Sequence, residues 1–279
     1  MTPSARLRDT VFAKLVRTYR ILFARKRWYP VNKLLFNLSL RGLGVLSDEW
    51  APRYTGELPL LRTLAARWTR GPVVFDVGAN VGEYARMVLE VAPTAAVYAF
   101  ESHKRSFAKL QSAAERLGYA AFNVACGDRE DTRTLYDYRD ADGSPHASLY
   151  RDVIETLHRG EVITHEVRMI ALDNFVREHR IGRVDLIKID AEGHELAVLQ
   201  GLRRTIADGA VDVIQFEFNS MNVISRSFFR DFYTALPDHA FYRLLPDGAV
   251  PLGQYSPTLC ELFAVQNIVA LRTASGIRL

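Results

Sequence analysis

The spacing of apolar residues predicts a buried strand that leads directly into a helix. The run over residues 73–77 is apolar apart from a single acid, as is typical of a strand that is buried on both faces of a sheet. After a short turn, apolar side chains recur at helical spacing at Ala85, Val88, Leu89 and Ala92. The pattern is therefore strand, turn and amphipathic helix.

The same alternation repeats along the chain and indicates the fold class. Strands are predicted at residues 73–77, 96–101, 119–125, 184–189 and 211–217, and helices at 81–92, 104–117, 194–207 and 225–235. Strands that alternate with helices form a parallel sheet with helices on both faces. We therefore expect a Rossmann-like, doubly wound α/β fold. Near the end of the chain, Phe241–Leu245, a Pro-Asp-Gly turn at 246–248 and Leu259–Val265 predict a closing antiparallel strand pair.

Residues 127–172 do not fit this repeat. They contain two short strand-like runs, 133–138 and 162–170, around a polar stretch at 140–146. The interruption falls between the third and fourth parallel strands, and ligands of open α/β sheets bind outside the carboxyl ends of such strands. We therefore expect an insertion near the place where a substrate binds.

Residues 1–50 are predicted to be a basic helical extension of a main domain at 51–279. Ten Lys or Arg and a single acid, Asp9, lie between residues 1 and 46, which gives this segment a net charge of +9. Because the whole chain carries +4, the remainder carries −5. Basic charge that is confined to an extension does not indicate a nucleic-acid partner, and none is expected.

The basic extension is also amphipathic. One helix face carries the apolar residues Phe12, Leu15, Val16, Tyr19, Leu22 and Phe23. Such a face can lie on an anionic membrane surface, but apolar helix faces usually mark packing. We favour packing on the protein's own body or on a second subunit of a homo-oligomer. A peripheral contact at the inner membrane surface is the alternative.

Cysteine content and hydropathy favour a cytoplasmic location. Cys126 and Cys260 are too few for a disulfide framework, and no Cys-x-x-Cys metal pattern occurs. No apolar run approaches the 18 or so residues that are needed to cross a bilayer.

A glycine-rich turn after the first strand indicates a cofactor. In Asp76-x-Gly78-x-Asn80-x-Gly82 the turn opens a helix, where α/β proteins hold nucleotide-like ligands. A nicotinamide-binding turn would carry glycine in place of Asp76, to approach a pyrophosphate. An acid suits S-adenosylmethionine instead, which carries an ammonium and a sulfonium but no phosphate. Glu101 ends the second strand, where a carboxylate can accept hydrogen bonds from ribose hydroxyls. Together these acids favour S-adenosylmethionine.

Three further strand-end motifs add a family resemblance. Asn123-Val-Ala-Cys-Gly-Asp128 ends the third strand, Leu186-Ile-Lys-Ile-Asp-Ala-Glu-Gly-His-Glu195 the fourth, and Ile214-Gln-Phe-Glu217 the fifth. With the glycine turn and Ala99-Phe-Glu101, this ordered series resembles the FkbM-type family of S-adenosylmethionine-dependent methyltransferases over residues 55–218. The resemblance implies a seven-stranded class I methyltransferase fold. It also implies O-methylation, commonly of sugars in glycolipids, polysaccharides or natural products.

The resemblance further implies which residues hold the cofactor. From the methionine end to the adenine end these are Asp76, Gly78, Asn80, Gly82, Glu101, Val124 and Ala125. Asp190 and Glu192 match the family's acidic motif after the fourth strand. Ser102 stands where the family usually carries proline, which leaves the neighbouring carboxylate in place. Glu57 stands where members often carry an acid, and we expect it to help close the cofactor site.

Methyl transfer to a hydroxyl needs alignment and a base that takes the proton. The candidate bases are Asp190, Glu192, His194, His146 and Glu217. Asp190 follows directly after a buried strand. An unpaired charge at such a position is unfavourable, so an acid there is more often functional than structural. Carboxylates at positions 190, 192 and 217 could also bind one Mg²⁺ through oxygen. We favour a site without metal.

The sequence leaves the acceptor open. Our main hypothesis is an O-methyltransferase that acts on a sugar hydroxyl of a glycolipid, glycan or glycosylated natural product. The alternatives are methylation of a non-sugar, polyketide-type hydroxyl, a nicotinamide-dependent oxidoreductase, and a non-catalytic binding module at a membrane.

Overall fold

The structure is a computed structural model that describes residues 3–46 and 55–279. It divides into two compact units, residues 1–45 and 46–279. The first unit contains helix α1 (Pro3–Phe23), a 3₁₀ helix (Lys26–Trp28) and helix α2 (Tyr29–Gly42). The Asn32 side chain joins its helices, because it accepts a hydrogen bond from the Tyr19 hydroxyl and donates one to the Phe23 carbonyl. The described part of the predicted extension is therefore helical.

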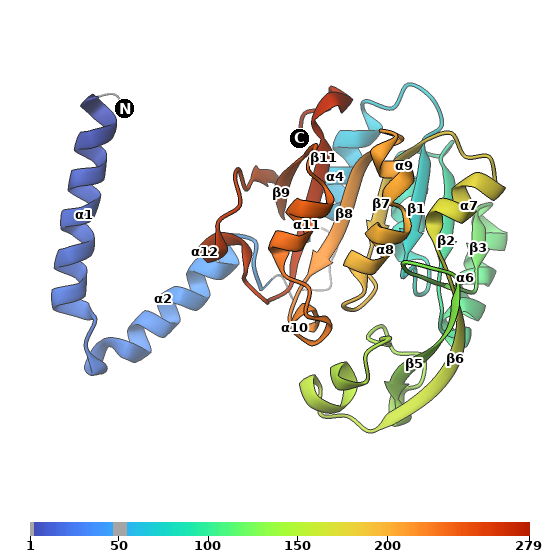
Figure 1. The fold of residues 1–279 in the computed structure, drawn as a ribbon, viewed down its shortest axis with the longest axis horizontal. Helices are drawn as coiled ribbons and strands as arrows, with labels where there is room; N and C mark the ends of the chain where they lie inside the picture. The colour runs from blue at the N-terminus through green and yellow to red at the C-terminus, as the bar shows by residue number, and fades with distance from the viewer. Residues whose placement is uncertain (1–2, 47–54) are drawn as a thin grey trace. The chain divides into compact units, whose positions relative to one another are not determined.

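The second unit is built on an eight-stranded sheet (Figure 1). Its strand order is β10-β9-β11-β8-β7-β1-β2-β3. The strands are β1 (Val73–Val77), β2 (Ala96–Phe100), β3 (Ala120–Phe122), β7 (Val184–Ile189), β8 (Val211–Phe218), β9 (His239–Leu245), β10 (Gly248–Pro251) and β11 (Gln266–Arg272). β1, β2, β3, β7 and β8 pair in parallel, whereas β9, β10 and β11 pair antiparallel. This confirms the predicted doubly wound, mostly parallel sheet.

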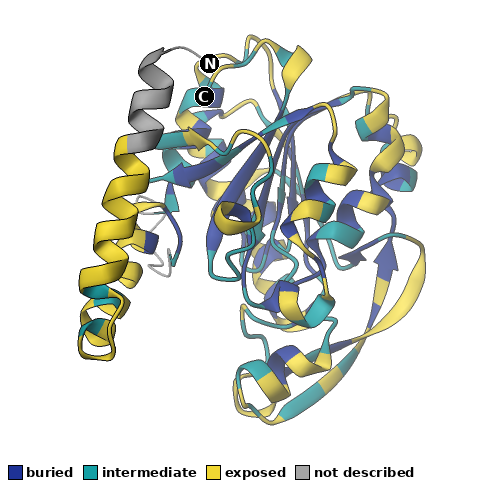
Figure 2. Ribbon diagram, turned by 60° about the vertical axis from the view of Figure 1, so that its left-hand side comes forward, coloured by how far each residue is buried: buried dark blue, intermediate teal, exposed yellow. Residues whose placement is uncertain are grey.

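Two helical layers cover the sheet, and strand periodicity decides which side chains meet each layer. Phe75 and Val77 pack in one core with Phe216 and Phe232. Val74 points to the opposite face of the sheet, where it packs in a second core with Leu61 and Val88. This follows from the alternation of side chains along a strand. The first layer contains α7 (Leu172–Glu178), α8 (Glu195–Gly201), α9 (Arg203–Ala207) and α11 (Phe229–Ala235). The second contains α4 (Glu57–Ala65), α5 (Glu83–Val91) and α6 (Lys104–Leu117). Figure 2 shows the strands between them as buried.

The insertion forms its own three-stranded sheet, in the order β4-β6-β5. β5 (Asp131–Tyr138) and β6 (Val162–Ile170) form an antiparallel pair, which extends away from the main sheet (Figure 1). These strands match the predicted runs 133–138 and 162–170. The short β4 (Ala125–Cys126) pairs in parallel with the end of β6, and thereby ties the insertion to the body.

Several predicted boundaries were wrong. The predicted strand 119–125 is broken, because β3 stops at Phe122 and β4 belongs to the other sheet. The predicted helix 194–207 is divided into α8 and α9 around Leu202. The predicted helix 225–235 is also divided, into α10 (Met221–Ser225) and α11, because Arg226 adopts a left-handed conformation with φ 58°.

The predicted strand 259–265 was wrong for a local reason. Pro257 stands at the first position of a short helix, α12 (Pro257–Cys260), where proline fits well because its missing N–H has no helical partner. The last strand therefore begins only at Gln266. The turn at 246–248 connects β9 with the short edge strand β10, so the sheet has eight strands where the family resemblance implied seven.

Candidate functional site

A cleft of about 400 Å³ lies at the carboxyl ends of β1, β7 and β8. A narrower slot of about 60 Å³ adjoins it. The two hollows share five lining residues, Gly78, Asn80, Pro145, Asp190 and Glu192. They therefore form one elongated site, to which both the sheet and the insertion contribute.

A row of polar side chains crosses the sheet beneath the cleft. Asp76 on β1 is in register with Lys188 on β7, which is in register with Gln215 on β8. Register neighbours point to the same face of a sheet, so these three side chains lie side by side. The Gln215 amide donates to Glu57 Oε1 at 2.8 Å, and the Tyr84 hydroxyl donates to Gln215 Oε1 at 2.7 Å. The row is thus tied to helices α4 and α5.

Asp76 lacks a close hydrogen-bond partner. It is fully buried, and no donor among the described residues lies in good hydrogen-bond geometry at either carboxylate oxygen; the backbone N–H of Ala85 is near enough only to lower its pKa slightly. Burial raises its pKa to about 6, against the opposing effect of the Lys188 charge. A buried acceptor without a donor is unfavourable, so this carboxylate suits a ligand that carries a positively charged donor.

Lys188 supplies the nearest positive charge in the described part of the site. Its Nζ donates to Asp190 Oδ2 at 2.9 Å. Burial acts to lower the pKa of Lys188, but the carboxylates of Asp190, Glu57 and Asp76 outweigh it and raise the pKa above its usual value. Lys188 therefore stays charged and offsets part of the acidity of the cleft.

Glu101 lies at the narrow slot, at the end of β2. Its Oε2 accepts the Asn80 N–H at 2.9 Å, and its Oε1 accepts the His103 N–H at 2.7 Å. Burial raises its pKa to about 7, despite these two hydrogen bonds. The Asn123 side chain donates to the carbonyls of Glu101 and Ser102, which fixes the loop where serine replaces the family's proline. The carboxylate keeps lone pairs that suit two ribose hydroxyls.

Apolar side chains line part of the slot beyond Glu101. They are Val124, Ala125, Leu135 and Leu149, and His194 lines the same slot. His194 Nδ1 lies 2.9 Å from the Tyr150 hydroxyl, whereas Nε2 is buried with no partner among the described residues. Burial lowers the His194 pKa to about 4, so this ring is neutral at ordinary pH. Such a slot suits a flat aromatic ring such as adenine.

The wider end of the cleft contains acids and histidines. His146 Nδ1 lies 3.2 Å from Glu192 Oε1, and His158 lines the same wall. Asn219 donates to Glu217 Oε1 at 2.6 Å. Burial and neighbouring acids raise the pKa values of Glu192 and Glu217 well above the usual range.

Most of the predicted site residues line this one site. Glu57, Asp76, His146 and Glu217 line the wide end, and Glu101, Ser102, Val124, Ala125 and His194 line the slot. Gly82 lines neither hollow; it precedes α5 with φ 88°. The sequence reasoning missed Tyr84, Gln215 and His158. Gln215 had a signal, because it is polar inside the apolar run of β8.

Gly78 provides a direct test of the turn geometry. It has φ +78°, and an added Cβ would lie 1.8 Å from the Asp190 carbonyl oxygen. We expect Gly78→Ala to lower the free energy of unfolding by at least about 1–2 kcal/mol, because the residue would be left-handed and would also clash with backbone. Urea unfolding measures this. Gly182→Ala is the control, since its Cβ would meet nothing within 4 Å, and an equal effect of both variants would contradict the prediction.

A cluster of two histidines and one aspartate among the described residues resembles a metal site. The ligand atoms of His103, Asp142 and His165 lie within 4.8 Å of one another, whereas those of Asp190, Glu192 and Glu217 form no such group. However, His103 Nδ1 accepts the N–H of Arg105. Its proton is therefore on Nε2, the atom that a metal would need, and Nε2 instead donates to Asp142 at 2.9 Å. The group fits a hydrogen-bonded link between the insertion and α6 better than a metal centre.

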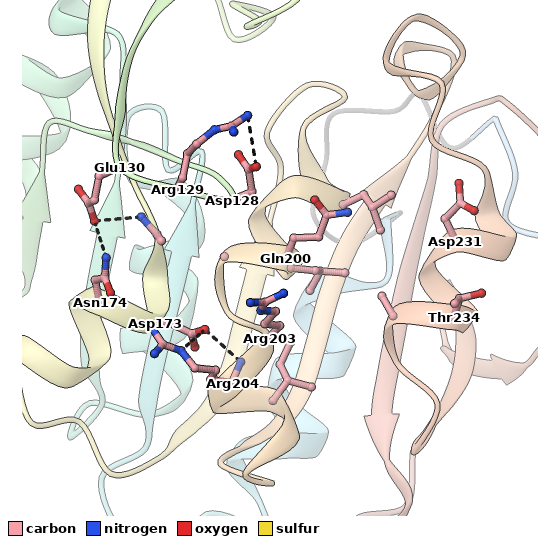
Figure 3. A pocket seen from close by; sticks show the side chains of 16 residues that line it. Asp128, Arg129, Glu130, Asp173, Asn174, Gln200, Arg203, Arg204, Asp231 and Thr234 are labelled. Carbon is pink, nitrogen blue, oxygen red and sulfur yellow. Dashed lines mark hydrogen bonds and ion pairs between the residues drawn. The ribbon is translucent and has the colours of Figure 1, made fainter.

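A separate hollow of about 890 Å³ lies on the side of the sheet that carries α7, α8, α9 and α11 (Figure 3). It shares no lining residue with the cleft. Its carboxylates are already engaged: Asp173 accepts from Arg204, Glu130 accepts from Asn174, and Asp128 pairs with Arg129. We therefore place the functional site in the cleft.

The fold and the cleft define an α/β protein whose site suits a nucleotide-like cofactor. The family model of the FkbM methyltransferase domain matches residues 76–243. This match covers more than half of the chain, so the chain belongs to the FkbM methyltransferase domain family, and the predicted resemblance is confirmed.

Known relatives resemble only part of the chain. It is 31% identical to the AMB antimetabolite synthetase AmbE of Pseudomonas aeruginosa, over 47% of this chain and 8% of that protein. It is 29% identical to the 31-O-demethyl-FK506 methyltransferase FkbM of Streptomyces tacrolimicus, over 47% of this chain and 60% of that protein. It is 25% identical to the hexuronic acid methyltransferase AglP of Haloferax volcanii, over 54% of this chain and 58% of that protein. The matched regions thus span 60% or less of each relative.

Proposed function

We propose that this protein transfers a methyl group from S-adenosylmethionine to a hydroxyl oxygen of a sugar-containing acceptor. The observation that carries the proposal is the buried, unpartnered carboxylate of Asp76 beside Gly78, at the carboxyl edge of a parallel sheet. The family membership supports the reaction class, and the relative that is named for a hexuronic acid supports a sugar acceptor.

The residues of the cleft fit this cofactor from end to end. Asp76 would face the ammonium group, and Glu101 would accept the ribose hydroxyls. Val124 and Ala125 would border the adenine in the slot. S-adenosylmethionine supplies the electrophilic methyl group. The protein's part is to hold the acceptor hydroxyl in line with that methyl group and to exclude water.

Asp190 and the pair Glu192 and His146 are the candidates at the wide end of the cleft to take the hydroxyl proton. Asp190 lines both hollows, and one of its oxygens is bound by Lys188. Glu192 and His146 form a polar pair at the wide end, with Oε1 3.2 Å from Nδ1. His194 lies instead at the slot, so its position favours contact with the adenine over proton transfer.

Glu101→Ala tests where the cofactor lies. We expect it to weaken binding of S-adenosylhomocysteine by about 1.5–3 kcal/mol, because charged hydrogen bonds to the ribose are lost. Calorimetry measures this affinity. Glu115→Ala is the control on an exposed position of α6. Unchanged affinity in a folded Glu101→Ala variant would refute this placement of the ribose.

The reaction itself is tested with methyl-labelled S-adenosylmethionine and an extract of lipids and glycans. We expect the label in a sugar-containing product, identified by mass analysis. A labelled product without sugar would favour a polyketide-type acceptor. Binding of NAD without binding of S-adenosylhomocysteine would favour an oxidoreductase, and cofactor binding without transfer to any acceptor would favour a binding module.

A further inference from the structure

Helix α1 separates apolar from basic side chains. At the helical repeat of 3.6 residues per turn, one group of apolar residues falls within an arc of about 140°. These residues are Val11, Phe12, Leu15, Val16, Tyr19, Leu22 and Phe23. Lys14, Arg17 and Arg20 lie outside that arc, and so does one exposed apolar residue, Ile21. The helix thus has the pattern of an element that lies in the plane of an interface.

These apolar side chains are uncovered within their unit. Phe12 is 66% exposed and Leu15 is 63% exposed. Figure 2 shows the described part of this helix as largely exposed. Helix α2 adds further exposed apolar residues, namely Tyr29, Val31, Leu34, Leu35, Phe36 and Leu38. The ring contacts of Phe23 with Tyr19 and Trp28 occupy only the junction between the helices. A contiguous apolar surface of this kind marks an interaction site.

The second unit offers no matching apolar surface among residues 55–279. Its large exposed apolar side chains are Leu117, Val223, Phe228, Val250 and Leu259. Leu117 ends α6, Val223 lies in α10, Val250 in β10 and Leu259 in α12, and Phe228 precedes α11. No element carries more than one of them, so none presents an apolar stripe like that of α1. A second copy of the chain would oppose one +9 segment to another, which is repulsive at low salt.

An anionic lipid surface satisfies both features. It accepts apolar side chains at the level of the headgroups, and it attracts Lys and Arg. No helix among the described residues has the length and hydropathy to cross a bilayer, so the contact would be a flat one. We propose that α1 and α2 dock the protein on a membrane surface that contains anionic lipids. This replaces the packing that the sequence alone favoured.

Vesicle co-sedimentation of the full chain tests this proposal. The probes are vesicles of 3:1 phosphatidylcholine and phosphatidylglycerol, and vesicles of phosphatidylcholine alone. We expect binding to the anionic vesicles at 50 mM NaCl that weakens at least about tenfold at 500 mM, because exposed charges are screened. Arg17→Gln/Arg20→Gln should weaken binding about 30-fold, roughly fivefold for each charge. Leu15→Gln should weaken it at least about tenfold.

Matched variants in the second unit serve as controls. Arg62→Gln/Arg67→Gln removes two exposed charges, and Leu259→Gln changes a leucine that is 48% exposed. Both should bind vesicles like the unaltered protein. Three results would overturn the proposal: no binding to either vesicle, equal effects of test and control variants, or a dimer in ultracentrifugation that Leu15→Gln dissociates. Because S-adenosylhomocysteine affinity is measured on the same samples, the proposed methyltransferase function is judged separately.

Discussion

Asp190→Asn is expected to give a folded protein whose methyl-transfer rate is at least about 100-fold lower. Asparagine keeps the shape of the side chain but removes its negative charge and its basicity, and a general base contributes about 100-fold or more. Asp190 lines both hollows of the site and holds Lys188 through Oδ2 at 2.9 Å. The substitution therefore also changes the charge balance at the place where the methyl group would be transferred.

Single-turnover rates at saturating cofactor measure this effect apart from binding. Asp208→Asn is the control, because Asp208 is exposed and lies outside both hollows. If the rate of Asp190→Asn stays within a few-fold, the base lies elsewhere, and His146→Asn is the next variant to test. Dialysis against a chelator addresses the metal alternative. Lost activity that Mg²⁺ restores would contradict the metal-free site that we favour.

Strand-end acids were predictable from the sequence because parallel strands end at one edge. Asp76, Glu101, Asp190 and Glu217 each stand at or near the end of an apolar run. The carboxyl ends of parallel strands meet on the same side of a sheet. Once the runs were identified as strands, the topology brought these carboxylates to one site without any knowledge of distant contacts.

Partners across the sheet were harder to predict. Lys188 and Gln215 interrupt apolar runs, but only the register of β1, β7 and β8 places them beside Asp76. That register depends on strand order, which the sequence pattern does not contain. His158 and Tyr150 belong to the insertion, where short runs define strands but leave the intervening loops open. Their positions follow from long-range contacts such as that of Tyr150 with His194.

Local chemistry explains the wrong boundaries. The stretch 259–265 is as apolar as a strand, but Pro257 starts a helix that runs through Cys260 and so takes up the beginning of the stretch. The helix predicted at 194–207 breaks between α8 and α9. Gly201 is the one glycine or proline within that stretch. Gly201 packs against the backbone of Gly127, where an added Cβ would lie 1.9 Å from the carbonyl oxygen. A tertiary contact of this kind leaves no periodic signal.

Asp76→Asn is expected to stabilise the protein without cofactor while it weakens cofactor binding. Burial raises the Asp76 pKa from 3.8 to about 6. The folded protein therefore keeps a proton that the unfolded chain releases between about pH 4 and pH 6. Ionisation in the fold is unfavourable, so the destabilising contribution of Asp76 grows as pH rises through this window and is complete above it. A shift of about two units corresponds to about 3 kcal/mol.

The comparison across pH isolates the charge from the effect of the amide. At pH 4 the folded Asp76 is mostly neutral, so the difference in unfolding free energy between variant and unaltered protein reflects mainly packing. Between pH 4 and pH 8 that difference should grow by about 2.5 kcal/mol in favour of Asp76→Asn, as measured by urea unfolding. Asp208→Asn should show no such growth. A difference that stays constant with pH would mean that Asp76 is not destabilised by its burial.

The same experiment connects stability with binding. If Asp76 faces the cofactor's ammonium group, S-adenosylhomocysteine should stabilise the unaltered protein above pH 6, because the carboxylate then gains an opposite charge. Asp76→Asn should lose most of this ligand-dependent stabilisation, although it is the more stable protein without ligand. A buried carboxylate with no partner is unfavourable in the empty fold. Opposite effects on stability and affinity would show that its charge serves the ligand and not the fold.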